Sequence, residues 1–329
     1  PMTWNAGDDT TVGTLVESRL GKAVVDKLVS PLLGGVYSCS AYDLGVRATL
    51  PQLGAALDRA GEGGQGFFLL DVVEDLLAKR RATAVGGGGS PFRSFDKGYR
   101  SLIEEMMRQA DPELILNSAV ESLGRTSDGR WVIDPLGTVD AVVVATSAPT
   151  ASVILEDAAP VAAEALGNVE LSSSAVVGMR FASDHGIPER SGVLLGSNSG
   201  TAAKAFTFSS KKWPHLAQGG GAFVRASFGT KDEPWYVDAS DRALFAYALE
   251  DLERVTGERK TPEEIFVQRW HGGIPCYGVK HAEKMSRVLD DVAGVPRLAV
   301  AGSMLRGVGV PATVATGIAA ADKIIADLG

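Results

Sequence analysis

The sequence is poor in cysteine and histidine. Its 329 residues include only two cysteines, Cys39 and Cys276, and four histidines. Two cysteines cannot build the disulfide framework of a small secreted domain, so their scarcity fits a reducing cytoplasm. The histidines have no metal-ligand spacing, and neither cysteine has a basic neighbour in sequence that would activate its thiol. We therefore expect a cytoplasmic protein with no metal site and no nucleophilic cysteine.

An excess of basic residues and a long uninterrupted apolar run are also absent. The 32 Lys and Arg residues against 40 Asp and Glu give a net charge of −8, which argues against a nucleic acid as partner. One membrane-like stretch, residues 298–321, is interrupted by four glycines and Pro311. Because a bilayer penalises unpaired backbone at such breaks, we interpret this stretch as a strand, a glycine loop and a helix of a folded domain.

The motifs of several enzyme classes are missing. The chain has no Gly-x-Ser-x-Gly, no Walker loop and no Gly-x-Gly-x-x-Gly after a predicted strand. Lys211 and Lys212, which precede Trp213, are compatible with a carboxylate site or, more simply, with a solvated turn. Because no acid–base set stands out, we expect any chemistry to come from a bound cofactor.

Apolar residues recur at regular spacing along the chain, whose length suits about two domains. The spacing predicts a helix over residues 12–20, ended by Gly21, and a second short helix over 25–32. Residues 33–37 (LGGVY) predict a tight apolar turn, and the glycine-rich segments 61–66 and 86–91 predict loops.

Short strand-like segments occupy the middle of the chain. Segment 141–146 is apolar on both faces, as in a parallel strand that is covered on both sides. The later segments follow one another closely, which predicts an antiparallel sheet. In chain order the segments are 114–116, 119–123, 131–134, 141–146, 176–181, 192–196, 205–209, 222–228 and 265–270.

Helix signals are strong in the second half. A helix over 244–255 is capped near Ser240 and stopped by Gly257, and Pro311 opens a final helix after a strand at 298–301. The predicted fold class is α/β of mixed α+β character. Parallel α/β pieces at about 98–150 and 260–329 are interleaved with a helical hairpin at about 10–85 and an antiparallel sheet at about 170–258.

The segment 301–311 (AGSMLRGVGVP) is the strongest candidate site. A buried strand ends in a glycine loop whose backbone amides lead into a helix N-terminus. Such a place receives an anion or the electron-rich edge of a cofactor, because unpaired N–H groups and the helix dipole point at it. A purely structural tight turn is the alternative interpretation.

Five blocks, in the same order along the chain, together resemble one family. The first joins residues 29–37 (VSPLLGGVY) and 44–53 (LGVRATLPQL), and the second is 94–99 (SFDKGY), where Lys97 replaces a usual glycine. The others are 140–149, 207–214 (TFSSKKWP), and 269–277 followed by 298–317. These blocks are similar to the bacterial protoporphyrinogen/coproporphyrinogen III oxidase family, FAD-dependent haem-biosynthesis enzymes of the amine-oxidase-like flavoproteins.

The resemblance implies part of a Rossmann-like FAD-binding domain interleaved with a substrate domain of antiparallel sheet and helices. The family begins with a strand and a Gly-x-Gly-x-x-Gly loop that hold the FAD pyrophosphate. That portion does not occur here, so we expect an incomplete parallel sheet and weak or no FAD binding by this chain alone. The implied parts are 1–92 (helical, substrate and membrane side), 93–165 (FAD-binding), 166–258 (substrate-binding) and 259–329 (FAD-binding).

The resemblance also implies site residues. Val120, Trp270, Val308, Gly309 and Val310 are expected near FAD, with Val120 at the adenine and Val308–Val310 near the isoalloxazine. The expected substrate slot is lined by Gly35, Gly192, Leu194 and Phe206. Ordinary core packing is the alternative for Val120 and for the slot residues. Arg47, Arg180 and Arg306 are candidate partners of substrate propionates, and nothing in the sequence ranks them.

The implied activity is oxidation of a porphyrinogen with O2 as acceptor and no essential acid–base side chain. The implied partners are the porphyrinogen, O2, haem-pathway enzymes and a peripheral membrane contact of a cytoplasmic protein. The alternatives are another amine-oxidase-like flavin oxidase or desaturase, and a truncated fragment that binds no flavin. The sequence leaves open whether the porphyrinogen carries two vinyls or four propionates.

Overall fold

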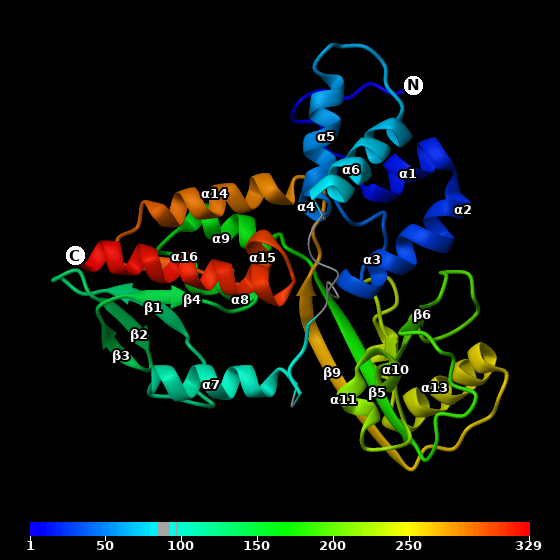
Figure 1. Cartoon of the computed structure of the whole chain (residues 1–329). Helices are drawn as coiled ribbons and strands as arrows, with labels where there is room; N and C mark the ends of the chain where they lie inside the picture. The colour runs from blue at the N-terminus through cyan, green and yellow to red at the C-terminus, as the bar shows by residue number, and fades with distance from the viewer. Residues whose placement is uncertain (84–92, 97) are drawn as a thin grey trace.

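The computed structural model describes residues 1–83, 93–96 and 98–329. The predicted loop at 86–91 and Lys97 lie outside the described residues. Figure 1 shows a group of helices at the top, a layer of helices and short strands at the left, and a twisted sheet at the lower right. Each of these parts has its own buried apolar cluster. The mixed α/β class predicted from the sequence is confirmed.

The helical part begins as the apolar spacing predicts. The first helix ends at Gly21, and Thr11 caps its start by accepting a hydrogen bond from the Thr14 amide. The turn predicted at 33–37 is wrong, because that segment is helical and the chain turns at Ser38 with φ 53°. Burial of the Leu33 and Tyr37 side chains outweighs the low helix propensity of the two glycines between them. The elements are α1 (Val12–Leu20), α2 (Lys22–Val24), a π-helical turn (Val25–Val29), α3 (Ser30–Tyr37), α4 (Val46–Thr49), α5 (Pro51–Gly61) and α6 (Leu69–Thr83).

The second part packs helices around short strands. Strands β4 and β10 pair in parallel, with Val143 opposite Ala299, and β1, β2 and β3 form an antiparallel meander. The glycine-broken stretch 298–321 is a strand, a loop and a helix, as predicted. The elements are α7 (Arg100–Ala110), β1 (Ser122–Arg125), β2 (Trp131–Asp134), β3 (Gly137–Val139), β4 (Val142–Val144), α8 (Ala148–Leu155), α9 (Pro160–Gly167), α14 (His281–Ala293), β10 (Leu298–Val300), α15 (Ser303–Arg306) and α16 (Val310–Leu328).

Two strand predictions in this part are wrong in detail. Residues 114–116 form no strand, and the side chains of Leu114 and Leu116 are more than 60% exposed (62% and 68%). Strand β4 is not covered on both sides, because Val143 is 43% exposed. Among the described residues the parallel sheet has only β4 and β10, so these apolar segments lack the neighbours that would pair with them or cover them.

The third part is a five-stranded antiparallel sheet in the order β6-β7-β8-β5-β9. Helix α13 packs against it, capped by Ser240 and ended by Gly257 as predicted. Strand β9 starts in the predicted last region, yet it pairs along β5 and so belongs to this sheet. The elements are β5 (Leu171–Phe181), β6 (Gly192–Leu194), β7 (Ala205–Phe208), α10 (Ser209–Lys212), α11 (Pro214–Ala217), β8 (Ala222–Phe228), α12 (Trp235–Asp238), α13 (Asp241–Thr256) and β9 (Glu264–Pro275).

Candidate functional site

The two faces of the five-stranded sheet differ in burial. On β5 the side chains of Ala175, Val177, Met179 and Phe181 are buried, and they share a core with α13. The alternating residues of β5, from Ser174 to Arg180, are only half-buried. Because successive side chains of a strand point to opposite faces, the sheet has one face packed on α13 and one more accessible face. We call the second the open face.

Strand register shows which predicted residues share the open face. Two neighbouring rows cross the sheet from β6 to β9, and directly paired residues point to the same side. One row is Gly192, Thr207, Arg225, Gly178 and Phe266, and the next is Leu194, Ala205, Ser227, Val176 and Gln268. Trp270 pairs with Ser174 one step further along β5 and is 47% exposed. The register therefore brings Gly192, Leu194 and Trp270 to one face.

Phe206 and Gly35 lie differently. Phe206 alternates with Thr207 and points to the α13 side, where it is 1% exposed in the core. Its side chain therefore does not reach the open face. Gly35 lies near the end of α3, and a Cβ built on it would come 3.3 Å from the Leu194 side chain. Gly35 and Leu194 thus meet at the edge of the sheet where α3 contacts β6.

The glycine loop after β10 is held at both of its sharp turns. Gly302 (φ 139°) donates its amide hydrogen to the Thr316 hydroxyl at 2.9 Å. Gly307 (φ 128°) donates to the Tyr277 hydroxyl at 2.8 Å, and that hydroxyl donates to the Ser303 carbonyl. Both glycines occupy backbone conformations that other residues rarely adopt.

Gly309 differs from Gly302 and Gly307 in its backbone conformation. It precedes α16 with φ −74° and ψ 148°, so the chain does not turn sharply there. Gly309 and Val310 are exposed, whereas Val308 is half-buried against the core of the helical part. The first turn of a helix leaves its amides without intrahelical partners, and the dipole of the 19-residue α16 favours an electron-rich group at this end. This exposed end is therefore a candidate site for an electron-rich group.

The sequence did not predict a role for His281, whose side chain contacts the Met304 carbonyl in this loop. His281 is buried and stacks on Tyr277, with ring centroids 4.1 Å apart. Burial lowers the pKa of His281 and raises the pKa of Tyr277 to about 12, so both rings are neutral near pH 7. The two rings come together only through the turn between β9 and α14, which has no local sequence signal.

Val120 belongs to the second part of the fold. It lies just before β1, half-buried against the core that β4, α8 and α14 share. Strand β1 starts two residues later than Val120, at Ser122. Val120 is therefore at the edge of the α/β layer and not on the open face of the antiparallel sheet.

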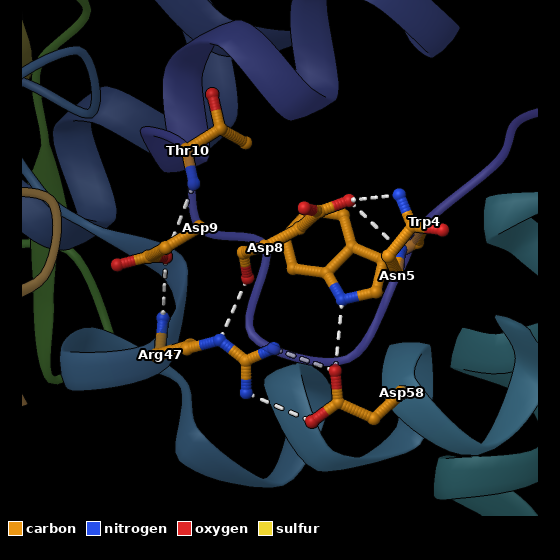
Figure 2. A network of polar contacts seen from close by, with 7 residues as sticks. All are labelled: Trp4, Asn5, Asp8, Asp9, Thr10, Arg47 and Asp58. Atoms are coloured by element: carbon orange, nitrogen blue, oxygen red, sulfur yellow. Dashed lines mark hydrogen bonds and ion pairs between the residues drawn. The ribbon is translucent and has the colours of Figure 1, made fainter. Parts of the chain in front are cut away.

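The three candidate arginines differ in what they contact. The guanidinium of Arg47 donates two hydrogen bonds to the Asp58 carboxylate, at 2.6 and 2.8 Å, and one to the Asp8 carbonyl at 2.7 Å. Figure 2 shows this network, in which the Trp4 indole also donates to Asp58. Arg180 pairs with two glutamates at the end of β9. Arg306 is exposed and has no polar partner among the described residues. Of the three arginines, it is therefore the one whose guanidinium no carboxylate of the described chain occupies.

No helix in the described ranges is long and apolar enough to cross a bilayer. Within the same ranges, no group of His, Cys, Asp and Glu side chains is arranged to hold a metal ion. Lys211 lies in the short helix α10, where its side chain is 14% exposed and pairs with Asp184 and Glu189, so the predicted solvated turn is wrong.

Comparison with known proteins identifies relatives over the whole chain. A coproporphyrinogen III oxidase of Mycobacterium leprae is 36% identical over 332 residues, which cover 100% of this chain and 70% of that protein. A coproporphyrinogen III oxidase of Bacillus subtilis is 28% identical and covers 95% of this chain and 67% of its own length. A solved structure from Exiguobacterium sp. 255-15, assigned as a protoporphyrinogen oxidase, superposes with a TM-score of 0.80 at 28% identity over 98% of this chain and 68% of that chain.

More distant structures share the fold alone. Cyclohexylamine oxidase from Brevibacterium oxydans superposes with a TM-score of 0.64 at 12% identity, over 97% of this chain and 67% of that chain. The family model described as flavin containing amine oxidoreductase matches residues 5–325. The expectations of an oxidoreductase and of a flavin cofactor are thereby confirmed. The chain belongs to the flavin containing amine oxidoreductase family.

Proposed function

We propose that the protein is an FAD-dependent porphyrinogen oxidase of haem biosynthesis, which converts coproporphyrinogen III to coproporphyrin III with O2 as electron acceptor. The observation that carries this proposal is the 36% identity, over the whole chain, to a coproporphyrinogen III oxidase. The structure adds a compatible site. The open face of the sheet carries the apolar side chains of Trp270 and Leu194, and a separate helix N-terminus suits the flavin ring.

The open face can bind a substrate, and its two central rows offer no acid–base catalyst. Those rows contain no carboxylate and no histidine. The bound flavin would supply the hydride acceptor, so the residues of this chain need only position the substrate and exclude water. Exposed apolar side chains such as Leu194, Phe266 and Trp270 suit that task, because a tetrapyrrole is wide and largely apolar.

Two other readings remain as alternatives. Protoporphyrinogen IX is the second substrate candidate, favoured by the assignment of the Exiguobacterium structure. An amine oxidase is the other alternative, and structures such as cyclohexylamine oxidase share only the fold with this chain. We also infer a cytoplasmic location from the two free, buried cysteines, since secreted proteins usually pair theirs.

Turnover of the two porphyrinogens tests the proposal. The purified holoenzyme is mixed in air with coproporphyrinogen III or protoporphyrinogen IX, and the fluorescence of the porphyrin and the release of hydrogen peroxide are followed. We expect faster turnover of coproporphyrinogen III. Faster turnover of protoporphyrinogen IX would replace the substrate assignment, and oxidation of amines alone would overturn the proposal.

A separate titration tests flavin binding by these 329 residues. The spacing Gly-x-Gly-x-x-Gly occurs at residues 61–66, but there it follows helix α5. The motif does not follow a strand in the described residues, where its amides would hold the pyrophosphate of FAD. We expect FAD to bind this chain much more weakly than it binds an intact relative that carries the loop. Equal affinities, measured by quenching of flavin fluorescence, would contradict this expectation.

A further inference from the structure

Arg225 lies near the middle of the open face. It sits on β8 between Thr207 of β7 and Gly178 of β5, in the row that ends at Gly192 and Phe266. Its guanidinium has one polar contact among the described residues, a 3.4 Å hydrogen bond to the Thr207 hydroxyl. Strand period alone does not reveal this position, because it does not tell which side of β8 is covered.

Arg225 differs from the other arginines of the sheet in having no counter-ion. Arg180, at the end of the same face, pairs with Glu263 and Glu264, and Arg269 pairs with Asp241. No acidic side chain in the described part of the chain pairs with Arg225. The surrounding sheet removes part of its hydration, which lowers the pKa of the guanidinium but leaves it charged near neutral pH.

An apolar surface adjoins this cation. The Phe266 ring lies against Gly178, since a Cβ built on Gly178 would come 3.1 Å from the ring. Phe266 is 58% exposed, and any larger residue at position 178 would have to displace the ring. Arg225 itself is exposed on this face, so its guanidinium is accessible to an anion from outside. The row therefore pairs a flat aromatic side chain with a cation that lacks its anion.

We propose that Arg225 binds a propionate carboxylate of the porphyrinogen, with Thr207 orienting the guanidinium and Phe266 contacting the macrocycle. This assignment rests on the proposed function and adds to it a residue that binds the substrate. An arginine matches a carboxylate with two parallel N–H donors, which fixes direction as well as charge. It also explains why a single cation lies within an otherwise uncharged pair of rows.

Porphyrin binding by the variants is the direct test. Coproporphyrin III, which keeps all the propionates of the substrate, is titrated into the 329-residue chain and the change in its absorbance is measured. We expect Arg225→Met to weaken binding about 10- to 100-fold, and Arg225→Lys to restore part of the loss. Arg180→Met is the matched control, because it removes an arginine of the same face that already has its carboxylates. It should leave the affinity unchanged.

Kinetics of the holoenzyme provide the second readout. Arg225→Met should raise KM for coproporphyrinogen III by a similar factor, weaken the salt dependence of KM, and change kcat and the melting temperature little. Equal losses in Arg225→Met and Arg180→Met, or no loss in Arg225→Met, would overturn the assignment. If the wild type oxidises porphyrinogen and Arg225→Met has the same KM and the same affinity for coproporphyrin III, only the assignment of Arg225 fails. If the wild type neither binds coproporphyrin nor oxidises porphyrinogen, the proposed function fails with it.

Discussion

Tyr277 and His281 stack with ring planes 16° apart and hold the same short segment through different atoms. The Tyr277 hydroxyl connects the Ser303 carbonyl to the Gly307 amide, and His281 donates from Nε2 to the Met304 carbonyl at 2.7 Å. The carbonyl oxygen can only accept, so Nε2 carries the proton. The two rings therefore fix α15 and the turn that leads to the exposed N-terminus of α16.

Removing the Tyr277 hydroxyl should loosen this segment. In Tyr277→Phe the Gly307 amide loses its acceptor, and we expect a loss of about 1–3 kcal/mol in the free energy of unfolding. Flavin binding by the holoenzyme should weaken as well, because α16 is displaced. Tyr37→Phe is the control: Tyr37 neighbours Tyr277, with ring centroids 5.7 Å apart, but its hydroxyl has no hydrogen bond in the described structure. Equal denaturation midpoints for the two variants would contradict the prediction.

Substitutions at Gly307 and Gly309, in the same loop, should have different effects: the first on stability and the second on flavin binding. Gly307→Ala places a side chain at φ 128° and 2.9 Å from the Ala312 side chain, so it should destabilise the fold by about 1–3 kcal/mol. Gly309→Ala meets only Pro311 at 3.9 Å and should leave stability unchanged. Gly309→Leu should then lower flavin content and activity without lowering the melting temperature. If activity and melting temperature fall together in Gly309→Leu, with flavin content unchanged, Gly309 is structural.

Arg47 should contribute to stability and not to substrate binding. Its ion pair with Asp58 is partly shielded from solvent, with side-chain exposures of 20% and 27%. Arg47→Met leaves the Asp58 carboxylate without its ion-pair partner, so we expect a loss of about 1–3 kcal/mol in the free energy of unfolding. The KM for porphyrinogen should stay unchanged. Arg47→Met/Asp58→Leu should lose less than the sum of the single variants. A rise in KM without destabilisation would instead make Arg47 a propionate partner.

Lys204 should make stability rise with pH in the alkaline range. It is half-buried, and its ammonium donates hydrogen bonds of 2.6 Å to the Ser38 hydroxyl and the Gly229 carbonyl. Loss of hydration lowers its pKa from 10.5 to about 8. Between these two values the unfolded chain binds more protons than the folded chain, so the free energy of unfolding increases as pH rises. The full gain is at most about 3 kcal/mol.

Chemical denaturation at several pH values between about 7.5 and 9.5 measures this effect. The difference in unfolding free energy between wild type and Lys204→Met should grow with pH, because the variant lacks the titrating group. Lys22→Met is the control, since Lys22 is an exposed lysine paired with Asp26, and its difference from wild type should stay flat over this range. Parallel profiles for all three proteins would refute the prediction for Lys204.

Local signals were enough for the elements whose ends are set by nearby residues. The spacing of apolar residues and a terminal glycine predict α1 and α13, and Pro311 predicts the start of α16. Local signals failed at residues 33–37, where two glycines indicate a turn. The buried side chains on either side of them keep α3 helical, and this burial depends on residues distant in the sequence.

The sequence by itself determined the fold class, the family and the position of the glycine loop. Each of these rests on local patterns: the fold class and the family on several such patterns in order along the chain, and the loop on one of them. Only the tertiary structure decided which face of the sheet is open, which separates Leu194 and Trp270 from Phe206 and reveals Arg225. It also decided that Arg47 already has its carboxylate. The alternation of a strand marks two faces but not which one is covered, and a charged side chain does not show its partner, because both depend on long-range packing.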